Sequence, residues 1–402
     1  MSRQLVSRSP DLKRLQDEGY DIKISDSNYL LVRVPYVTAT RQVCYGTLVS
    51  DLTLQGDVTA SPATHVVSFI GQAEGDIPYD DQGHELADLI NQRGPIQLGG
   101  SLIASCTFSH KPNPTYPDYY EKMTTYAHML FSYAQAIDPG VKVRTFPPIP
   151  DEDEESVFHY LDTATSRARI GAVTDKIRLG KVVIIGLGGT GAYILDAVAK
   201  TPVKQIHLYD GDVMLTHNAF RAPGAASLNE LRAAPKKVDY YKEKYAAMHR
   251  HIVQHASHVS AANIDELRDA DFVFISIDGG RAKQSIIEKL EKFGVSFVDV
   301  GMGLYQVGNS LGGLIRTTAS VPGHSSHVRS NGRISFAEEA DDEYDQNIQI
   351  AELNMFNAAQ AVIKWKKIYG FYTDFEHEYS STYTIDGNHL LNEDQADEDF
   401  SS

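Results

Sequence analysis

The pattern of hydrophobic and polar positions predicts that the first part of the chain is a mixture of strands and one long helix. Short stretches rich in β-branched and aromatic residues predict strands over residues 28–37, 42–54 and 64–71. Apolar residues recur at helical spacing over 118–137 and predict a helix there. We therefore expect an N-terminal α+β domain, and we find no motif for chemistry in it.

The later part of the chain alternates between strand-like and helix-like patterns. The segments KVVII, QIHLYD, DFVFISID and SFVDVG read as strands, and AYILDAVAKT and RAKQSIIEKLEKFG read as helices between them. This alternation predicts a Rossmann-like, doubly wound, mostly parallel sheet covered by helices. A further helix is expected near NIQIAELNMFNAAQAVIKW, where core packing explains the apolar positions.

Prolines and acidic residues mark the boundary between the two parts. Pro148 and Pro150 resist regular structure, and the run DEDEE follows them at once. The expected organisation is an N-terminal domain of unknown role at 1–148, an acidic proline-rich linker at 149–156, a larger domain at 157–385 and an acidic tail at 386–402.

The negative charge is concentrated in three short segments. The chain has a formal net charge of −16, and residues 151–155, 337–346 and 386–402 carry seventeen acids with no Lys or Arg. Without these segments the formal charge is +1. The acidic segments read as solvated spacers or as a docking surface for a basic partner, and the near-neutral remainder is compatible with nucleotide binding.

The chain has only two cysteines, Cys44 and Cys106, which favours a cytoplasmic location. No apolar run is long enough to span a bilayer, and the N-terminus lacks the apolar stretch of a signal peptide. We expect no membrane partner and no nucleic-acid partner.

A glycine-rich turn lies between the first strand and the first helix of the larger domain. Gly186, Gly188, Gly189 and Gly191 let backbone N–H groups approach an anion at the positive end of the helix. Asp210, at the end of the next strand, can bind a ribose hydroxyl. This loop alone fits an NAD(P)-dependent oxidoreductase and an ATP-dependent enzyme equally well.

The polar residues that follow favour the ATP-dependent enzyme. Asp212, Asn218, Arg221 and Lys237 come after the second strand, and Asp278 ends a later one. When a carboxylate attacks the α-phosphate of ATP, two anions approach each other, so cations must neutralise the phosphates. Arginine can bind phosphate oxygens in a fork, lysine can act as a point charge, and a carboxylate can hold Mg²⁺.

Together, GLGGTG, LYDGDVMLTHNAFR, KKV and SID resemble the ThiF/MoeB family of E1-like enzymes, which activate ubiquitin-like proteins. The resemblance covers about residues 160–375. It implies that Asp210 binds the ATP ribose, that Asn218, Arg221 and Lys237 contact the phosphates, and that Asp278 coordinates Mg²⁺. It also implies a homodimer, in which an arginine upstream of the first strand reaches into the partner's site. Arg167 and Arg169 are the candidates.

The sequence departs from this family in its cysteines. No cysteine follows Cys106, so we expect no thioester on the adenylation domain and no structural zinc from paired cysteines. Three routes remain for the activated acyl group. A hydroxyl of Thr317, Thr318 or Ser320, in a stretch expected to be a crossover loop, can replace the thiol if a histidine activates it. Cys106 can act across domains, or the acyl group can pass directly to a partner.

These features favour adenylation of a C-terminal carboxylate by ATP and Mg²⁺ in a bacterial enzyme. The N-terminal stretch resembles domains of unknown function that are fused to bacterial ThiF-like proteins. That resemblance implies a ubiquitin-like substrate and an E2-like acceptor protein. The alternatives are adenylation of a peptide or small-molecule carboxylate, an NAD(P)-dependent oxidoreductase, and a catalytically idle scaffold.

Overall fold

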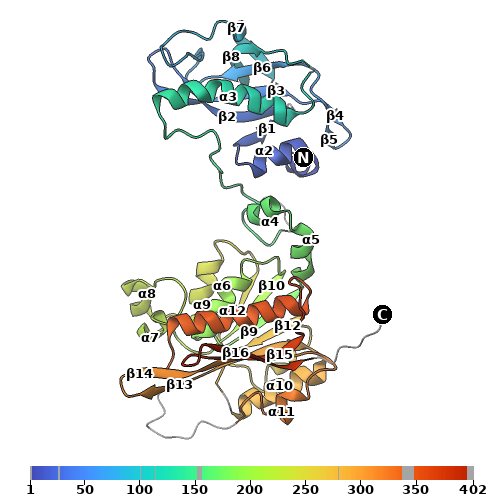
Figure 1. Ribbon diagram of the computed structural model, residues 1–402, viewed down its shortest axis with the longest axis vertical. Coiled ribbons are helices and arrows are strands. Elements are labelled where there is room, and N and C mark those ends of the chain that lie inside the picture. Colours follow the sequence, from blue (N-terminus) through green and yellow to red (C-terminus); the bar gives the residue numbers. More distant parts are fainter. Residues whose placement is uncertain are drawn as a thin grey trace. The chain divides into compact units, whose positions relative to one another are not determined.

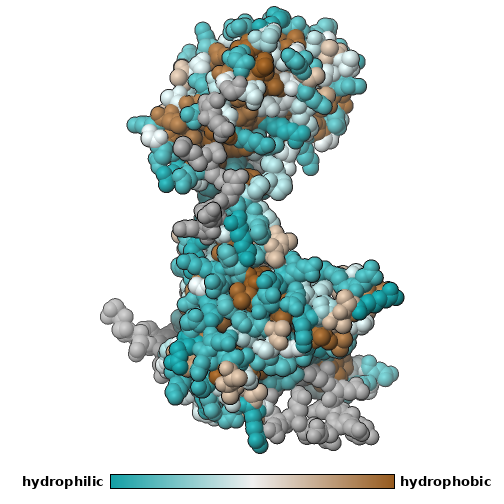
Figure 2. Space-filling model, turned by 180° about the vertical axis from the view of Figure 1, so that it is seen from behind, coloured by the Kyte–Doolittle hydropathy of each residue, from teal (hydrophilic) through white to brown (hydrophobic). Residues whose placement is uncertain are grey.

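The computed structural model describes residues 2–25, 28–99, 101–113, 115–151, 156–278, 280–336 and 348–395. The chain divides into two compact units, Met1–Ile149 and Pro150–Ser402 (Figure 1). The described residues contain no helix that is long and apolar enough to cross a membrane. Figure 2 shows hydrophilic side chains over most of the visible face of the second unit, with smaller hydrophobic patches between them.

The first unit is built on an antiparallel sheet of six strands, in the order β1-β2-β3-β6-β8-β7. The strands are β1 (Ile22–Ile24), β2 (Tyr29–Val37), β3 (Val43–Asp51), β6 (Val66–Ile70), β7 (Ile90–Gly99) and β8 (Leu102–Ser109), with a separate small ribbon of β4 (Leu54–Gln55) and β5 (Val58–Thr59). The helices are α1 (Ser2–Arg8), α2 (Pro10–Asp17) and α3 (Tyr119–Ile137). The α+β prediction is confirmed.

The long helix α3 begins at a side-chain cap and buries one face against the sheet. The Asp118 carboxylate accepts a hydrogen bond from the N–H of Glu121, which satisfies one of the free donors of the first turn. Met123 and Tyr126 of α3 are fully buried in the same core as Phe69 and Phe108 of the sheet. The predicted strands and helix of this unit therefore share one hydrophobic core.

The second unit contains an eight-stranded mixed sheet in the order β11-β10-β9-β12-β13-β14-β15-β16. Its first five strands are parallel and the last three are antiparallel. The strands are β9 (Lys181–Ile185), β10 (Gln205–Tyr209), β11 (Ile252–His255), β12 (Phe272–Ile275), β13 (Ser296–Val307), β14 (Ser310–Ser320), β15 (Glu378–Thr384) and β16 (His389–Gln395). The prediction of a doubly wound, mostly parallel sheet is confirmed.

Helices cover both faces of this sheet (Figure 1). They are α4 (Thr163–Ala168), α5 (Gly171–Thr174), α6 (Gly189–Val198), α7 (Thr216–Ala219), α8 (Leu228–Ala233), α9 (Lys237–Tyr245), α10 (Arg281–Phe293), α11 (His327–Ser330) and α12 (Ala351–Ile368), with the 3₁₀-helices η1 (Asp175–Ile177) and η2 (Ile264–Leu267). On one face, Trp365 of α12 packs against Phe272 and Phe274. On the other, Ile286 and Leu290 of α10 are buried.

Two sequence expectations are corrected by the sheet. Residues 314–320, expected in a crossover loop, belong to β14, which pairs with both β13 and β15. Residues 389–395, expected in the acidic tail, form β16 at the edge of the sheet. Residues 396–402 of that tail, residues 152–155 of the linker and the late acidic segment at 337–346 lie outside the described residues.

Candidate active site

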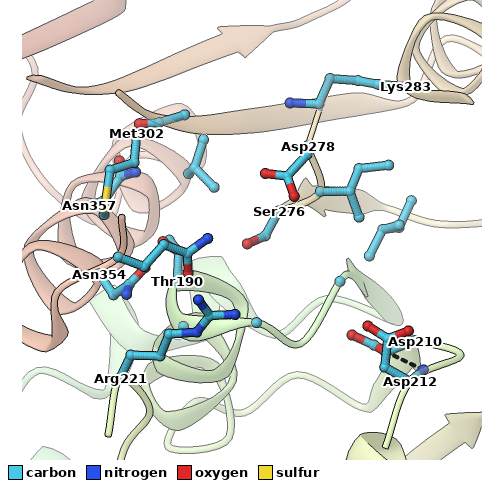
Figure 3. Close-up of a pocket in the computed structure, with 18 of the residues that line it drawn as sticks. Thr190, Asp210, Asp212, Arg221, Ser276, Asp278, Lys283, Met302, Asn354 and Asn357 are labelled. Carbon is cyan, nitrogen blue, oxygen red and sulfur yellow. Dashed lines mark hydrogen bonds between the residues drawn. The ribbon is translucent and has the colours of Figure 1, made fainter. Parts of the chain in front are cut away.

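A cavity of about 810 Å³ opens at the carboxyl ends of the parallel strands (Figure 3). The chain runs from β9 through β10 to β11 on one side and then returns to β12 on the other side of β9. Ligands of doubly wound sheets bind at such a reversal of strand order, and a cavity of this size can hold a nucleotide together with part of a second substrate. The fold therefore places the candidate site where a nucleotide is expected.

The glycine loop between β9 and α6 forms one wall of the cavity. Gly186 has φ +87°, a left-handed conformation that favours glycine. Gly188 immediately precedes α6, and a Cβ added there would meet no other atom, so its backbone faces open space. Gly189 lines the cavity too. Gly191 does not, and a Cβ there would lie 1.9 Å from the carbonyl oxygen of Gly186. Gly191 thus allows close packing of α6 on the loop.

Asp210 is anchored by the backbone around it. Its side chain is 5% exposed, its Oδ2 accepts a 2.7 Å hydrogen bond from the N–H of Leu187, and its Oδ1 accepts a 2.8 Å bond from the N–H of Asp212. Each carboxylate oxygen has two lone pairs, so a ribose hydroxyl can still donate to it. The two backbone bonds fix this carboxylate at the cavity wall beside the glycine loop.

Lys237 is paired with the two carboxylates of this corner. Its Nζ lies 2.8 Å from Asp212 Oδ2 and 3.5 Å from Asp210 Oδ2, and its side chain is 8% exposed. The hydrogen bond from Lys237 lowers the pKa of the Asp212 carboxyl. The ammonium group therefore compensates the acidic charge of Asp210 and Asp212 at this corner of the cavity.

Arg221 lines the cavity and points toward the glycine loop (Figure 3). Its Nε is buried and has no hydrogen-bond partner among the described residues. A buried guanidinium donor without a partner is costly unless an anion pairs with it. This arrangement fits the phosphate role expected for Arg221.

Asn218 and the two upstream arginines are not part of the cavity wall of the single chain. The Asn218 side-chain oxygen accepts a 2.9 Å hydrogen bond from the N–H of Leu215, and the residue is buried. Asn218 thus caps α7 in this structure, and its phosphate contact stays a prediction. Arg167 in α4 and Arg169 just after it are exposed.

Asp278 follows β12 and is exposed at the cavity, with Ser276 beside it (Figure 3). The described residues contain no group of three or more His, Cys, Asp or Glu that could hold a metal ion. Mg²⁺ keeps several waters and is often held by one or two carboxylates together with substrate phosphates. One carboxylate at the rim is compatible with that form of binding.

The expected acyl acceptors are all buried away from the cavity, which corrects the hydroxyl and thiol hypotheses. Thr317 and Thr318 are fully buried in β14 and Ser320 is 2% exposed. Cys106 is fully buried in the core of the first unit, where burial raises the pKa of its thiol to about 12. A buried hydroxyl or a protonated, buried thiol is a poor nucleophile.

Several cavity residues were missed by sequence reasoning. Lys283 from α10, Arg316 from β14, and Asn354 and Asn357 from α12 all line the cavity. The Thr190 hydroxyl donates a 2.7 Å hydrogen bond to Asn354. One signal was available: Asn354 and Asn357 are at helical spacing with Ala361 and Trp365, so they fall on the apolar face of this helix and need buried partners.

Comparison with known families agrees with this site. The ThiF family profile matches residues 163–383, and the profile of a domain of unknown function, DUF6791, matches residues 10–163. The family match covers more than half of the chain, and the cavity at the strand reversal is large enough for a nucleotide. Together they identify the chain as an ATP-dependent adenylyltransferase. The chain belongs to the ThiF family. This result does not support the oxidoreductase alternative.

Solved structures with a similar fold include E. coli MccB in complex with AMPCPP and MccA, at 15% identity and a TM-score of 0.46, covering 71% of this chain and 85% of that one. E. coli MccB with MccA-N7isoASN shares 16% identity at a TM-score of 0.46, covering 58% and 68%. PaaA shares 16% identity at a TM-score of 0.44, covering 55% and 75%. No curated protein sequence matches the chain.

Proposed function

We propose that the second unit uses ATP to adenylate the C-terminal carboxylate of a ubiquitin-like protein. The observation that carries this proposal is the buried, unpartnered Nε of Arg221 beside the glycine loop, in a cavity that also holds the anchored Asp210. A guanidinium for phosphate and a carboxylate for ribose, at the two sides of one loop, fit a nucleoside triphosphate. The ThiF family membership supports the same chemistry.

The reaction forms one bond and breaks one. A carboxylate oxygen of the substrate attacks the α-phosphorus of ATP, and the bond from that phosphorus to the bridging oxygen breaks, so pyrophosphate leaves with the electron pair. Backbone N–H groups at Gly188 and Gly189 would hold the phosphates, and Arg221 would stabilise their developing charge. Asp210 would orient the ribose. Lys237 would keep that corner near neutral. Mg²⁺, held by Asp278 and the phosphates, would supply further charge neutralisation.

The acyl group then passes to a nucleophile on another protein. The burial of Thr317, Thr318, Ser320 and Cys106 supports direct transfer over an intermediate on this chain. An E2-like protein is the acceptor that fits a ubiquitin-like substrate. Working in the cytoplasm as a homodimer, the enzyme would receive Arg167 or Arg169 from the partner subunit at the phosphate end of its cavity.

The test is incubation with ATP, Mg²⁺ and a purified ubiquitin-like protein encoded beside the gene, followed by intact mass analysis of both proteins. We expect the substrate protein to gain the mass of AMP and the enzyme to gain no adduct. A hydroxylamine-sensitive adduct on this chain would contradict direct transfer. Adenylation of a short peptide but not of the protein would favour the peptide alternative.

A further inference from the structure

A buried carboxylate on β13 holds two cations in the cavity wall. Asp299 is fully buried, and its Oδ1 lies 2.8 Å from Lys283 Nζ while its Oδ2 lies 3.0 Å from Arg316 Nη2. The Lys283 side chain is 4% exposed and that of Arg316 is 19% exposed. Lys283 and Arg316 line the cavity, whereas Asp299 lies behind them.

Three separate elements build this cluster. Lys283 lies in the first turn of α10, Asp299 is on β13, and Arg316 is on β14 opposite Gly301. A Cβ added to Gly301 would lie 2.9 Å from Arg316 Nη2, so the glycine leaves room for the guanidinium. The fold therefore positions both cations against one rigid carboxylate.

The cluster of Lys283, Asp299 and Arg316 has one more positive charge than it has negative charges. One carboxylate faces two cations, and the Nε of Arg316 is buried without a hydrogen-bond partner among the described residues. Surplus charge in a low-dielectric site is costly unless an anion pairs with it. The cluster thus suits an anion that enters from the cavity.

The nucleotide phosphates already have a place at the opposite wall. Figure 3 shows Arg221 beside the glycine loop and Lys283 on the other side of the cavity, with Asp278 and Ser276 between them. In an in-line displacement the attacking carboxylate and the leaving pyrophosphate lie on opposite sides of the α-phosphorus. A second cationic site across the cavity is where the attacking carboxylate would be held.

The wall next to the cluster fits the backbone of an extended chain. Gly301, Met302 and Gly303 of β13 line the cavity, and a Cβ added to Gly303 would meet no other atom. Farther along the same hairpin, Tyr305 is 51% exposed and Val307 is 61% exposed. Glycines let a peptide backbone approach closely, and the exposed apolar side chains beyond them offer contacts to the protein that carries the tail.

We propose that Lys283 and Arg316 bind the carboxylate of the acyl substrate, that Asp299 positions them, and that the last residues of the substrate lie along Gly301 and Gly303. This proposal rests on the proposed adenylation function. It assigns a substrate that is the C-terminal end of an extended chain.

The test separates the acyl substrate from the nucleotide. The variants are Lys283→Met and Arg316→Met, each of which removes the surplus positive charge and leaves Asp299 paired with the remaining cation. Lys200→Met is the matched control, because it removes a lysine that is paired with Asp196 on the surface. Thermal denaturation confirms that each variant folds. Calorimetric titration with AMPCPP measures nucleotide affinity without any acyl substrate.

Pyrophosphate exchange then measures KM for synthetic peptides that carry the last residues of the ubiquitin-like protein, as the free carboxylate or the C-terminal amide. Loss of a hydrogen bond to a charged group should raise the peptide KM of either variant about tenfold or more. AMPCPP affinity should stay within about threefold, and the amide should be inert. The control should match the wild type.

The alternative outcomes have distinct meanings. Loss of AMPCPP affinity equal to that of Arg221→Ala would place phosphate at the cluster and overturn the proposal. An unchanged peptide KM in folded variants would show that the cluster only braces the sheet, and would also overturn it. Absence of exchange by the wild type with every carboxylate would instead reject the proposed function, and the carboxylate site with it.

Discussion

The Thr190 hydroxyl on α6 donates a 2.7 Å hydrogen bond to the side-chain oxygen of Asn354 on α12. Asn354 is 1% exposed, and its amide nitrogen is buried without a hydrogen-bond partner among the described residues. A Cβ added to Gly189 would lie 2.2 Å from that nitrogen, so Asn354 packs directly on the glycine loop. The C-terminal helix therefore supports the loop that is expected to bind phosphate.

Replacement of Asn354 should weaken both stability and nucleotide binding. Asn354→Ala leaves the buried Thr190 hydroxyl without its acceptor and opens space beside Gly189, which should cost about 1–3 kcal/mol of unfolding free energy. Thr190→Val is the matched partner for a double-mutant cycle. The cycle, measured by urea denaturation, should give a coupling energy of about 1 kcal/mol. Additive effects of the two substitutions would contradict a direct interaction.

Two glycines of the loop should respond differently to alanine. Gly188→Ala adds a methyl group that meets no protein atom, so the melting temperature should stay near that of the wild type while ATP binding weakens. Gly191→Ala places a methyl group 1.9 Å from the Gly186 carbonyl oxygen, so it should lower the melting temperature strongly. Thermal denaturation with and without ATP distinguishes the two effects. Equal melting temperatures for both variants would show that the loop packs differently.

These glycines illustrate what sequence could predict. Local backbone preferences determine the strand, the glycine turn and the helix at residues 181–198. Their order and their place in the sheet could therefore be predicted from the sequence pattern. The position of Asp210 could be predicted in the same way, because this residue lies at the end of the next strand. Local sequence preferences also led to one wrong prediction. The threonines at 317 and 318 suggested a polar loop, but β-branched residues favour strands and pairing on both sides buries them.

The missed residues depend on contacts between distant segments. Lys283, Asp299 and Arg316 come from one helix and two strands, and only the sheet order brings them together. Asn354 and Thr190 are 164 positions apart. No local spacing connects such residues, so their partnership appears only when the topology is known.

His249 should make the second unit sensitive to mild acid. It is fully buried, its Nε2 lies 2.9 Å from the carbonyl oxygen of Val203, and its Nδ1 accepts a hydrogen bond from the N–H of His251. Burial lowers its pKa to about 4. Between pH 6.5 and 4 the unfolded chain therefore binds a proton that the folded chain does not. The free energy of unfolding should fall as pH falls through this window, by up to about 1.4 kcal/mol per unit.

Urea denaturation at pH 7 and pH 5 checks this prediction. The chain has a single tryptophan, Trp365, in the core of the second unit, so its fluorescence reports the unfolding of that unit. His249→Gln keeps a donor and an acceptor but does not titrate, and should lose less stability between the two pH values. The same loss in both proteins would mean that His249 is not the group responsible.

Lys122 should give the first unit a pH dependence of the same sign at alkaline pH. Its ammonium is fully buried and donates a 2.8 Å hydrogen bond to the Ser50 hydroxyl, and burial lowers its pKa to about 8. Above pH 8 the folded state loses this proton while the unfolded state keeps it. Lys122 should therefore favour the folded first unit increasingly from about pH 8 to 9.5, before tyrosines of the unfolded chain begin to ionise. Cys106 acts against it over the same range, because its thiol ionises in the unfolded chain and stays protonated where it is buried.

Thiol labelling in urea can follow this unit, because both cysteines lie in it and Cys106 is buried. As pH rises from 8 to 9.5, the labelling rate of Cys106 relative to its unfolded rate should rise less, or fall more, in the wild type than in Lys122→Met. Lys122→Met should keep only the opposing dependence that comes from the Cys106 thiol. Persistence of the same dependence in the variant would assign it to another group.

The most direct test of the central claim is exchange of labelled pyrophosphate into ATP. The wild type should catalyse exchange only when its carboxylate substrate is present, because pyrophosphate can re-form ATP only from the acyl-adenylate. Arg221→Ala and Asp278→Ala should abolish the exchange, while the surface variant Lys200→Met should retain it. Exchange that continues unchanged in Arg221→Ala and Asp278→Ala would contradict the assignment of this cavity as the adenylation site.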